Sequence, residues 1–377
     1  MGNVVSTDSL PFFSPYTLGC SLLCCFVGSS WVLNRWPHML HKRRGILTGG
    51  PLDGPMPVCI AHRGGQAEAP ENTLSAFKYS IEECGCEMIE LDVWVSKDKQ
   101  LVVVHDDNLS RVCGTDTRVK DTDYGALPRV RSSKEIELGA AAEPSTPECS
   151  HAGSFFEFFP EFKCFPRQFE GEKMPLLEDV YKAFPSALIN VDMKGPLDHQ
   201  AIRDVVALTR RYKREKKTVF GGFMQQKLDL IKKEFPEAVM AVGPRRTFLY
   251  LLSYYLGILP FIRIHEDIFE FPVSYAYVKR EALRIAAKRR ERAPRCLQFL
   301  FADAVARAEA WLTFSLITNP GFVSALKRRG LLVLGWVVNK EEEYKDALDR
   351  IGCHGLMTDR PMHLRQYLDM RNKKCKK

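Results

Sequence analysis

The sequence predicts an α/β protein built as a TIM-type (β/α)₈ barrel. Short apolar runs alternate with amphipathic stretches from about residue 57 onward, a rhythm typical of parallel strands joined by helices. The chain has 377 residues, of which 45% are apolar and 27% are charged, so it can bury a large core. Because a TIM barrel takes about 250 residues, one barrel with insertions accounts for this length better than two ordinary domains.

The order of the elements follows from the apolar runs. We assign the barrel to residues 57–370. Helical periodicity lies between many of the strands, for example at 73–83 and 201–212. Residues 106–173 break the rhythm with an irregular, partly low-complexity stretch, which predicts an insertion after the third strand. The candidate strands are 58–61, 88–93, 100–105, 188–192, 218–221, 238–242, 332–338 and 355–358.

A largely apolar, uncharged run at residues 10–33 precedes the barrel. It has the length of a membrane-crossing helix, which needs about 20 residues. Basic residues follow the run and none precedes it, which favours a retained single-pass anchor over a cleaved signal peptide. We assign 1–44 to this anchor and its basic flank, and the Gly- and Pro-rich 45–56 to a linker. The flank favours a cytosolic catalytic domain on the endoplasmic reticulum or another endomembrane.

The N-terminal residues and a second apolar run each allow more than one interpretation of how the chain meets a membrane. Residues 1–6 fit the pattern for myristoylation of Gly2, in which case Cys20, Cys24 and Cys25 are candidates for palmitate in place of a span. A second uncharged run, 247–262, is short for a span and predicts either a buried barrel helix or a lipid-contacting wall near the active-site mouth. Residues 371–377 form a basic tail.

Composition excludes some classes of function. The net charge of +8 is spread along the chain without an Arg-rich arm, so nucleic acid is not an expected partner, whereas an anionic lipid surface or substrate is. The twelve cysteines are scattered, and the single Cys84-x-Cys86 pair has no companion at zinc-site spacing. We therefore expect no zinc site.

Carboxylates are embedded in two apolar strands at two-residue spacing. Glu90 and Asp92 share one face of their strand, and Asp192 and Lys194 share one face of another. Such residues point into a barrel near its carboxyl end, where barrel enzymes keep their sites. Buried carboxylates need a compensating cation, and oxygen donors are the ligands of Mg²⁺ or Ca²⁺. The alternative is a salt-bridge network with Lys194 and Arg63, but two such pairs together favour one divalent cation.

Two histidines lie at the ends of apolar runs. His62 and Arg63 follow the first candidate strand before a Gly-Gly turn, and His105 ends the third. A base and an acid that titrate near neutrality suit phosphodiester cleavage. Arg63 and Lys194 are candidate donors to the phosphate oxygens.

The ordered set of motifs resembles the glycerophosphodiester phosphodiesterase family, over residues 57–368. The motifs are His62-Arg-Gly64, Glu71-Asn-Thr73, Glu90-x-Asp92, His105-Asp106, Asp192-Met-Lys194, Gly335-Trp336 and Gly355–Asp359. The N-terminal run and the stretches around 185–194 and 257–261 are similar to its membrane-bound lysophospholipase D branch.

The resemblance implies a role for each matching residue. His62 and His105 would be the acid–base pair, and Glu90, Asp92 and Asp192 would hold the metal. Arg63 and Lys194 would contact the phosphate, and Asn72 would orient the site. Trp336 would either form an aromatic wall for the glycerol or leaving group or pack in the core. Many relatives have Glu at the position of Asp192, which leaves Mg²⁺ versus Ca²⁺ open.

The implied activity is metal-dependent hydrolysis of glycerol-headed phosphodiesters, with lysophospholipids giving lysophosphatidic acid and the headgroup alcohol. The substrate's own glycerol hydroxyl would attack phosphorus, and water would then open the cyclic phosphate. The alternatives are a phosphoinositide-type phospholipase C, which also places two histidines and a metal on a barrel, and a catalytically silent membrane adaptor.

Overall fold

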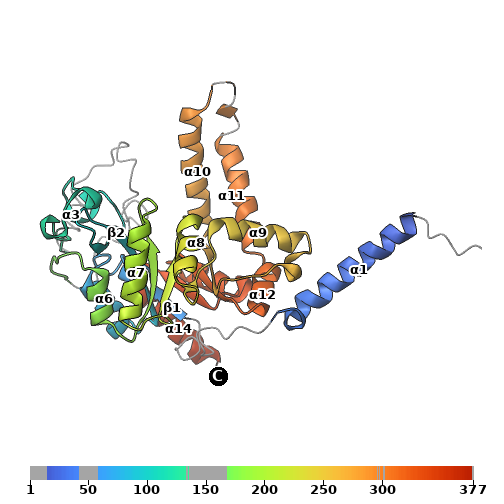
Figure 1. Ribbon diagram of the computed structural model, residues 1–377, viewed down its shortest axis with the longest axis horizontal. Coiled ribbons are helices and arrows are strands. Elements are labelled where there is room, and N and C mark those ends of the chain that lie inside the picture. The colour runs from blue at the N-terminus through green and yellow to red at the C-terminus, as the bar shows by residue number, and fades with distance from the viewer. Residues whose placement is uncertain are drawn as a thin grey trace, which may run out of the picture.

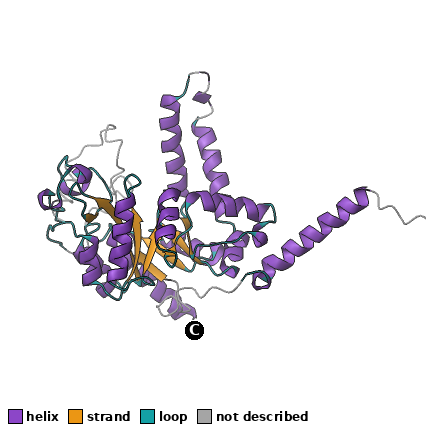
Figure 2. Cartoon of the chain, viewed as in Figure 1, coloured by secondary structure: helices purple, strands orange, loops and turns teal. Residues whose placement is uncertain are grey.

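Eight parallel strands form the wall of a barrel (Figure 2). The computed structural model describes residues 15–41, 58–132, 135, 168–294, 296, 298–299 and 302–375. Around the wall the strands follow the order β6-β5-β4-β2-β1-β9-β8-β7. They are β1 (Val58–Ala61), β2 (Met88–Val95), β4 (Leu188–Met193), β5 (Thr218–Gly221), β6 (Val239–Met240), β7 (Ile268–Pro272), β8 (Leu332–Trp336) and β9 (Gly355–Thr358).

The barrel closes between β6 and β7 through very few backbone contacts. A parallel bridge joins Ala241 to Ile268. Beside it, the Asp267 amide donates to the Met240 carbonyl at 2.9 Å and the Val242 amide donates to the Ile268 carbonyl at 2.8 Å. The TIM-like barrel predicted from the sequence is therefore confirmed.

Side chains that face the lumen change character along the strands. At the amino ends they are apolar, and Ile60, Met88, Leu188, Ile268 and Leu332 belong to one buried cluster. Because side chains alternate along a strand, the residues two and four positions after Met88 face the same lumen. The lumen thus has an apolar floor, and its polar layers begin above that floor.

Helices cover the outside of the wall (Figure 1). Outward-facing strand residues such as Ile89, Leu91 and Val191 pack in the main core with apolar helix residues. The covering helices are α2 (Leu74–Lys78), α6 (Leu177–Ala183), α7 (His199–Arg211), α8 (Gln225–Glu234), α9 (Pro244–Tyr255), α12 (Pro320–Arg328), α13 (Glu341–Lys345) and α14 (Pro361–Cys375); the π-helical turns η4 (Tyr79–Glu83) and η9 (Asp346–Ile351) extend α2 and α13.

One strand predicted from the sequence lies outside the barrel wall, and one wall strand was not predicted. The segment predicted at 100–105 forms β3 (Leu101–Val103), which pairs antiparallel with β2 and lies outside the barrel wall. The Ser96 amide bonds to the Gln100 carbonyl, so the connection is a tight turn, whereas parallel strands need a crossover of about a dozen residues. The eighth wall strand is instead β7, an apolar run interrupted by Glu270 and ended by Pro272.

A helical hairpin stands on the barrel between β7 and α12. It consists of α10 (Tyr275–Arg292) and α11 (Asp303–Ile317), which project together from the barrel in Figure 1. The two helices pack on each other, with the rings of Tyr275 and Phe314 5.5 Å apart and an ion pair from Arg290 to Asp303. Neither helix of this hairpin was predicted from the sequence.

The predicted single-pass anchor is contradicted. Residues 15–35 form helix α1 (Pro15–Arg35), but no helix in the described part of the chain is both long and apolar enough to cross a membrane. Glycine, serine, threonine and asparagine residues are interspersed with its apolar residues and lower its mean hydropathy. The orientation and endomembrane location inferred from that anchor are withdrawn with it.

The end of α1 packs against the barrel. The Ser30 hydroxyl donates to the Gly257 carbonyl at 2.5 Å, and the rings of Phe26 and Phe261 stack at 6.2 Å. Farther on, Arg328 Nε donates to the Asn34 carbonyl at 2.7 Å. These contacts fix the helix end beside α12 and the 3₁₀ turn η7 (Leu259–Phe261).

The run at 247–262 is a barrel helix and turn with one apolar face outside. Tyr250 and Leu259 are buried, as the barrel-helix interpretation predicted, while Phe248 and Leu256 are exposed. Lipid contact by the exposed residues stays a prediction. Gly2, the linker 45–56 and half of the insertion 106–173 (residues 133–134 and 136–167) lie outside the described residues. The described half of the insertion includes α3 (Ser110–Cys113).

Lys227 of α8 holds the backbone at the end of β4. Its ammonium donates to the carbonyls of Met193, Lys194 and Gly195 at 2.8, 2.6 and 2.7 Å. An ammonium has three protons, so all of its donors are used on this one turn. The contacts fix the segment that presents Asp192 and Lys194.

Replacing Lys227 with Met should lower the free energy of unfolding by about 2 kcal/mol, because three carbonyls lose their donor. Denaturant unfolding measures this change. Lys233→Met, at an exposed position of the same helix, is the control and should change stability by less than about 0.5 kcal/mol. Equal unfolding midpoints for the two variants would show that the contacts add no stability.

Candidate active site

His62 lies in the turn after β1 and is held by an aspartate from the other end of the chain. Its Nδ1 lies 2.6 Å from Oδ1 of Asp359, which follows β9. Asn339 and Gln66 donate to the same carboxylate at 2.8 Å each. Burial and Arg63 oppose protonation of His62, but Asp359 and Glu90 outweigh them, so its pKa is raised. Asp359 thus orients the ring and leaves Nε2 toward the lumen.

His105 has a matching partner beside it. Its Nδ1 lies 2.7 Å from Oδ1 of Asp106, and Arg111 Nε donates to Oδ2 of Asp106 at 2.7 Å. Arg111 also pairs with Glu71, whose carboxylate lies 3.3 Å from Arg63 Nη1. Burial and the charge of Arg63 lower the pKa of His105. The two histidines are therefore each oriented by a carboxylate, and their pKa values are shifted in opposite directions.

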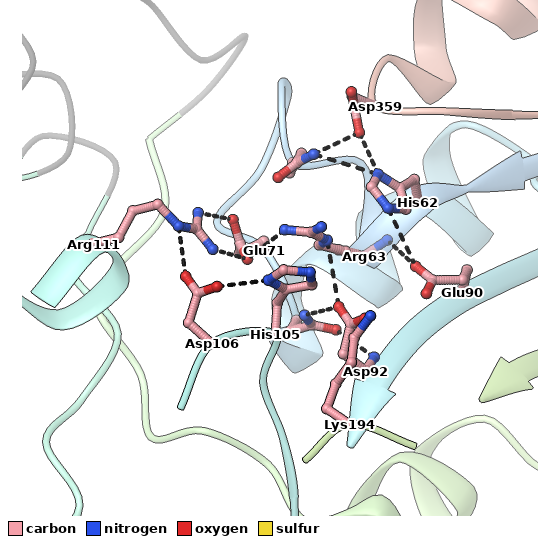
Figure 3. Close-up of polar contacts among 12 residues, drawn as sticks. His62, Arg63, Glu71, Glu90, Asp92, His105, Asp106, Arg111, Lys194 and Asp359 are labelled. Carbon is pink, nitrogen blue, oxygen red and sulfur yellow. Dashed lines mark hydrogen bonds and ion pairs between the residues drawn. The ribbon is translucent and has the colours of Figure 1, made fainter. Parts of the chain in front are cut away.

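The predicted carboxylates lie on the neighbouring strands β2 and β4. Figure 3 shows the two on β2, Glu90 and Asp92, together with Lys194 beside Asp92. Asp92 and Asp192 are register partners on β2 and β4. Lys194 Nζ lies 2.9 Å from Asp92 Oδ1 and 2.6 Å from Asp192 Oδ2. Asp92 Oδ2 is 3.3 Å from Arg63 Nε and accepts from Asn72 Nδ2 at 3.1 Å. Burial alone would raise the pKa of Asp92, but Lys194 and Arg63 help to hold it well below its usual range.

Glu90 lies one layer below Asp92. Its Oε2 accepts from the Arg63 backbone amide at 3.0 Å and lies 3.9 Å from His62 Nε2. Burial and the charge of Asp92 raise the pKa of Glu90 to about 7. Arg63 and Asn72 both adopt left-handed backbone conformations, with φ of 52° and 57°, which place their side chains against this cluster.

The donor chemistry at this point fits a divalent cation. Asp92 and Asp192 direct one oxygen each at the same cationic atom, Lys194 Nζ, and carboxylate oxygens are the ligands that Mg²⁺ and Ca²⁺ prefer. With the side chains as placed, however, the described residues contain no group of three or more His, Cys, Asp or Glu that could hold a metal ion. The three-carboxylate metal set stays a prediction.

Trp336 stands at the carboxyl end of β8 among other aromatic rings. Its ring lies 5.4 Å from that of Tyr277 at the start of α10 and 5.8 Å from that of Phe223 after β5, both edge to face. Phe223 is 68% exposed. Trp336 is thus one of three rings that form an aromatic rim at the carboxyl end of the barrel, and its role as a wall of the site stays a prediction.

Three orienting residues were missed in the sequence. Asp106 and Asp359 appeared in the motifs but received no role, although an acid next to a histidine was a usable signal for Asp106. Arg111 gave no signal, because it lies in an insertion without periodicity. The structure brings all nine predicted site residues to one end of the barrel, and their individual roles remain predictions.

Comparison with known proteins identifies the family. The model of the glycerophosphoryl diester phosphodiesterase family matches residues 62–242 and 245–363, which is most of the barrel. The chain belongs to the glycerophosphoryl diester phosphodiesterase family. It is therefore a phosphoric diester hydrolase, as the sequence predicted and in contrast to the silent adaptor alternative.

Relatives of this family member are similar over nearly the whole chain. Human "Lysophospholipase D GDPD1" is 31% identical, covering 96% of this chain and 98% of its own length. Human "Lysophospholipase D GDPD3" is 30% identical, covering 89% and 90%. A glycerophosphoryl diester phosphodiesterase structure from Silicibacter pomeroyi aligns with a TM-score of 0.56 at 18% identity, covering 85% of this chain and 95% of its own, which supports the fold.

The phosphodiesterase lumen contains a further acid, Glu270 of β7. Asn190 Nδ2 donates to Glu270 Oε1 at 2.7 Å, while the buried Asn190 Oδ1 has no donor among the described residues. A Cβ at Gly221 would lie 3.1 Å from Asn190 Oδ1 and 3.3 Å from Glu270 Oε2, so a larger residue there would press on both side chains of this pair. Burial raises the pKa of Glu270 to about 7. A protonated Glu270 can donate to Asn190 Oδ1 and complete a two-bond acid–amide pair.

We expect Glu270→Gln to gain stability over the wild type as the pH rises. Unfolded Glu270 loses its proton near 4.5, but the folded residue keeps it until about 7. The unfolded chain then binds fewer protons, so the stability of the wild type falls by about 3 kcal/mol as the pH rises through this range. Glutamine does not titrate. Urea unfolding at pH 5 and pH 8 in a chelator, with Glu291→Gln as the surface control, measures the difference. The same difference at both pH values would contradict the expectation.

Proposed function

We propose that this family member is a lysophospholipase D that cleaves glycerol-headed phosphodiesters carrying one acyl chain. The observation that carries the proposal is the pair of histidines, each held by an aspartate, on either side of a buried Lys–Asp–Arg cluster. The relatives named lysophospholipase D support the lysolipid substrate class. The products would be lysophosphatidic acid and the headgroup alcohol.

The two histidines exchange protons with the reacting oxygens. One takes the proton from the free glycerol hydroxyl of the lysolipid, whose oxygen attacks phosphorus. The other gives a proton to the departing headgroup oxygen, and a cyclic phosphate forms. In the second step water adds to phosphorus with the two roles exchanged, and the ring opens. Asp359 and Asp106 keep each Nδ1 occupied, so that Nε2 of both rings serves the substrate.

Cations of the chain bind the phosphate. Arg63 and Lys194 supply donors to its oxygens and offset the charge that develops there. Glu90, Asp92 and Asp192 would hold a divalent cation, Mg²⁺ or Ca²⁺. When bound, such a cation supplies Lewis acidity at the phosphate and lowers the pKa of a coordinated hydroxyl. Asn72 fixes the carboxylate of Asp92 for this purpose.

The aromatic rim is the surface that we assign to the acyl chain. Phe223, Tyr277 and Trp336 lie at the carboxyl end of the barrel, the end that carries the polar cluster. Phe223 is largely exposed, so it gains most from an apolar ligand that covers it. A soluble glycerophosphodiester has no acyl chain to place there.

His62→Ala and His105→Ala should each reduce turnover of lysophosphatidylcholine by about a hundredfold or more, because each removes a proton carrier. Release of labelled choline measures this. His199→Ala, at an exposed position of α7, is the control and should keep full turnover. Diacyl phosphatidylcholine, which lacks the attacking hydroxyl, should not be cleaved.

A turnover unaffected by either substitution would contradict the acid–base scheme. Release of inositol phosphate with diacylglycerol from labelled phosphatidylinositol, in place of choline release, would favour the phospholipase C alternative.

Phe223→Ala should lower kcat/KM for lysophosphatidylcholine by about tenfold and leave glycerophosphocholine nearly unchanged, since only the lysolipid covers the ring. Paired assays on the two substrates give the ratio. Phe299→Ala, which removes an equally exposed ring at the end of the α10–α11 hairpin, should leave the ratio unaltered. Equal losses on both substrates would assign Phe223 to the common glycerophosphate portion.

A further inference from the structure

One ammonium occupies the point at which two carboxylates of the cluster meet. Lys194 Nζ is within hydrogen-bond distance of both Asp92 and Asp192, at 2.9 and 2.6 Å. The position is set by the strands, because Asp92 and Asp192 are Cα partners on β2 and β4. Asp92 is 1% exposed, so its charge needs a nearby cation in every state of the folded chain.

The same oxygens suit either of two cations. They are hard carboxylate donors, which a divalent ion binds and which an ammonium also satisfies. An ion that takes both oxygens would lie where the ammonium now lies, and two positive charges at that separation repel strongly. The carboxylate pair therefore has room for one of them at a time.

The Lys194 side chain can leave without disturbing its backbone. Its amide donates to the Val93 carbonyl at 2.9 Å, and its carbonyl accepts from Lys227. The side chain itself is a flexible four-carbon stem and is 19% exposed, so its ammonium has a path toward the open end of the site.

We propose that Lys194 and the divalent cation replace each other on the Asp92–Asp192 carboxylate pair, and that the cation releases the ammonium to bind the substrate phosphate. The inference rests on the proposed function. Without the cation, two aspartates neutralise Lys194 and face an incoming phosphate with negative charge. With the cation in place, the ammonium is free to donate to that phosphate. Lys194 thus makes phosphate binding depend on prior cation binding.

Lys194→Met removes the competing charge and should bind Mg²⁺ about tenfold more tightly than the wild type, a gain of about 1.4 kcal/mol. Isothermal titration calorimetry with Mg²⁺ alone, and with Ca²⁺ alone, gives the affinities. Lys182→Met, at a solvent-exposed position of α6, removes the same charge elsewhere and should bind as the wild type does. Lys194→Arg keeps a competing cation and should stay within about threefold of the wild type.

A second measurement uses the unaltered enzyme, so it does not depend on a variant that folds. Acetylation of Lys194 by acetic anhydride, followed by mass spectrometry, should be faster with Mg²⁺ than in a chelator, because the released ammonium is no longer paired. Lys182 is the internal reference. An unchanged acetylation rate for Lys194 would overturn the exchange, even if Lys194→Met bound Mg²⁺ more tightly through loss of repulsion alone.

The experiments distinguish a failure of the proposed function from a failure of the proposed exchange. If wild-type turnover persists in a chelator and no cation binds, metal-dependent hydrolysis itself is wrong. If the wild type requires the cation, but Lys194→Met binds it no more tightly, only the exchange is wrong.

Discussion

A carboxylate held out of water inside the barrel is the constraint on which the site depends. Asp92 is almost fully buried, and a buried charge costs several kcal/mol unless cations and donors surround it. Lys194 and Arg63 supply the charge and Asn72 supplies the amide. The left-handed turns at Arg63 and Asn72 and the register of β2 with β4 are what bring these groups to Asp92. The site therefore depends on the turn after β1 and on the pairing of β2 with β4.

The orientation of the two histidines depends on residues outside the barrel lumen as well as inside it. His62 is held by Asp359, which lies 297 residues away in sequence, and His105 is held through Asp106 by Arg111 of the insertion. Glu71 joins Arg111 to Arg63, so His105 is linked to Arg63 by a chain of direct contacts. Insertion and barrel thus form one electrostatic unit.

Local patterns explain what the sequence could predict. Two-residue spacing revealed Glu90, Asp92, Asp192 and Lys194, because a strand alone decides which residues share a face. The antiparallel pairing of β3 was missed because it depends on the length of the turn before it. Strand β7 was missed because Glu270 interrupts its apolar residues and makes the segment look polar. The partners of His62 and the hairpin α10–α11 depend on contacts between distant segments, which periodicity does not encode. The prediction of a membrane anchor was wrong because counting apolar and uncharged residues overestimated the mean hydropathy of α1.

The wall of the barrel is most weakly paired where β6 meets β7. A barrel opens most easily where two neighbouring strands share the fewest backbone contacts. Strands β6 and β7 share one bridge and two backbone hydrogen bonds. The hydrogen bond between Asn190 and Glu270 joins β4 to β7 through the lumen, so it links strands on the two sides of that junction. We therefore expect local opening, measured as amide hydrogen exchange, to begin where β6 meets β7.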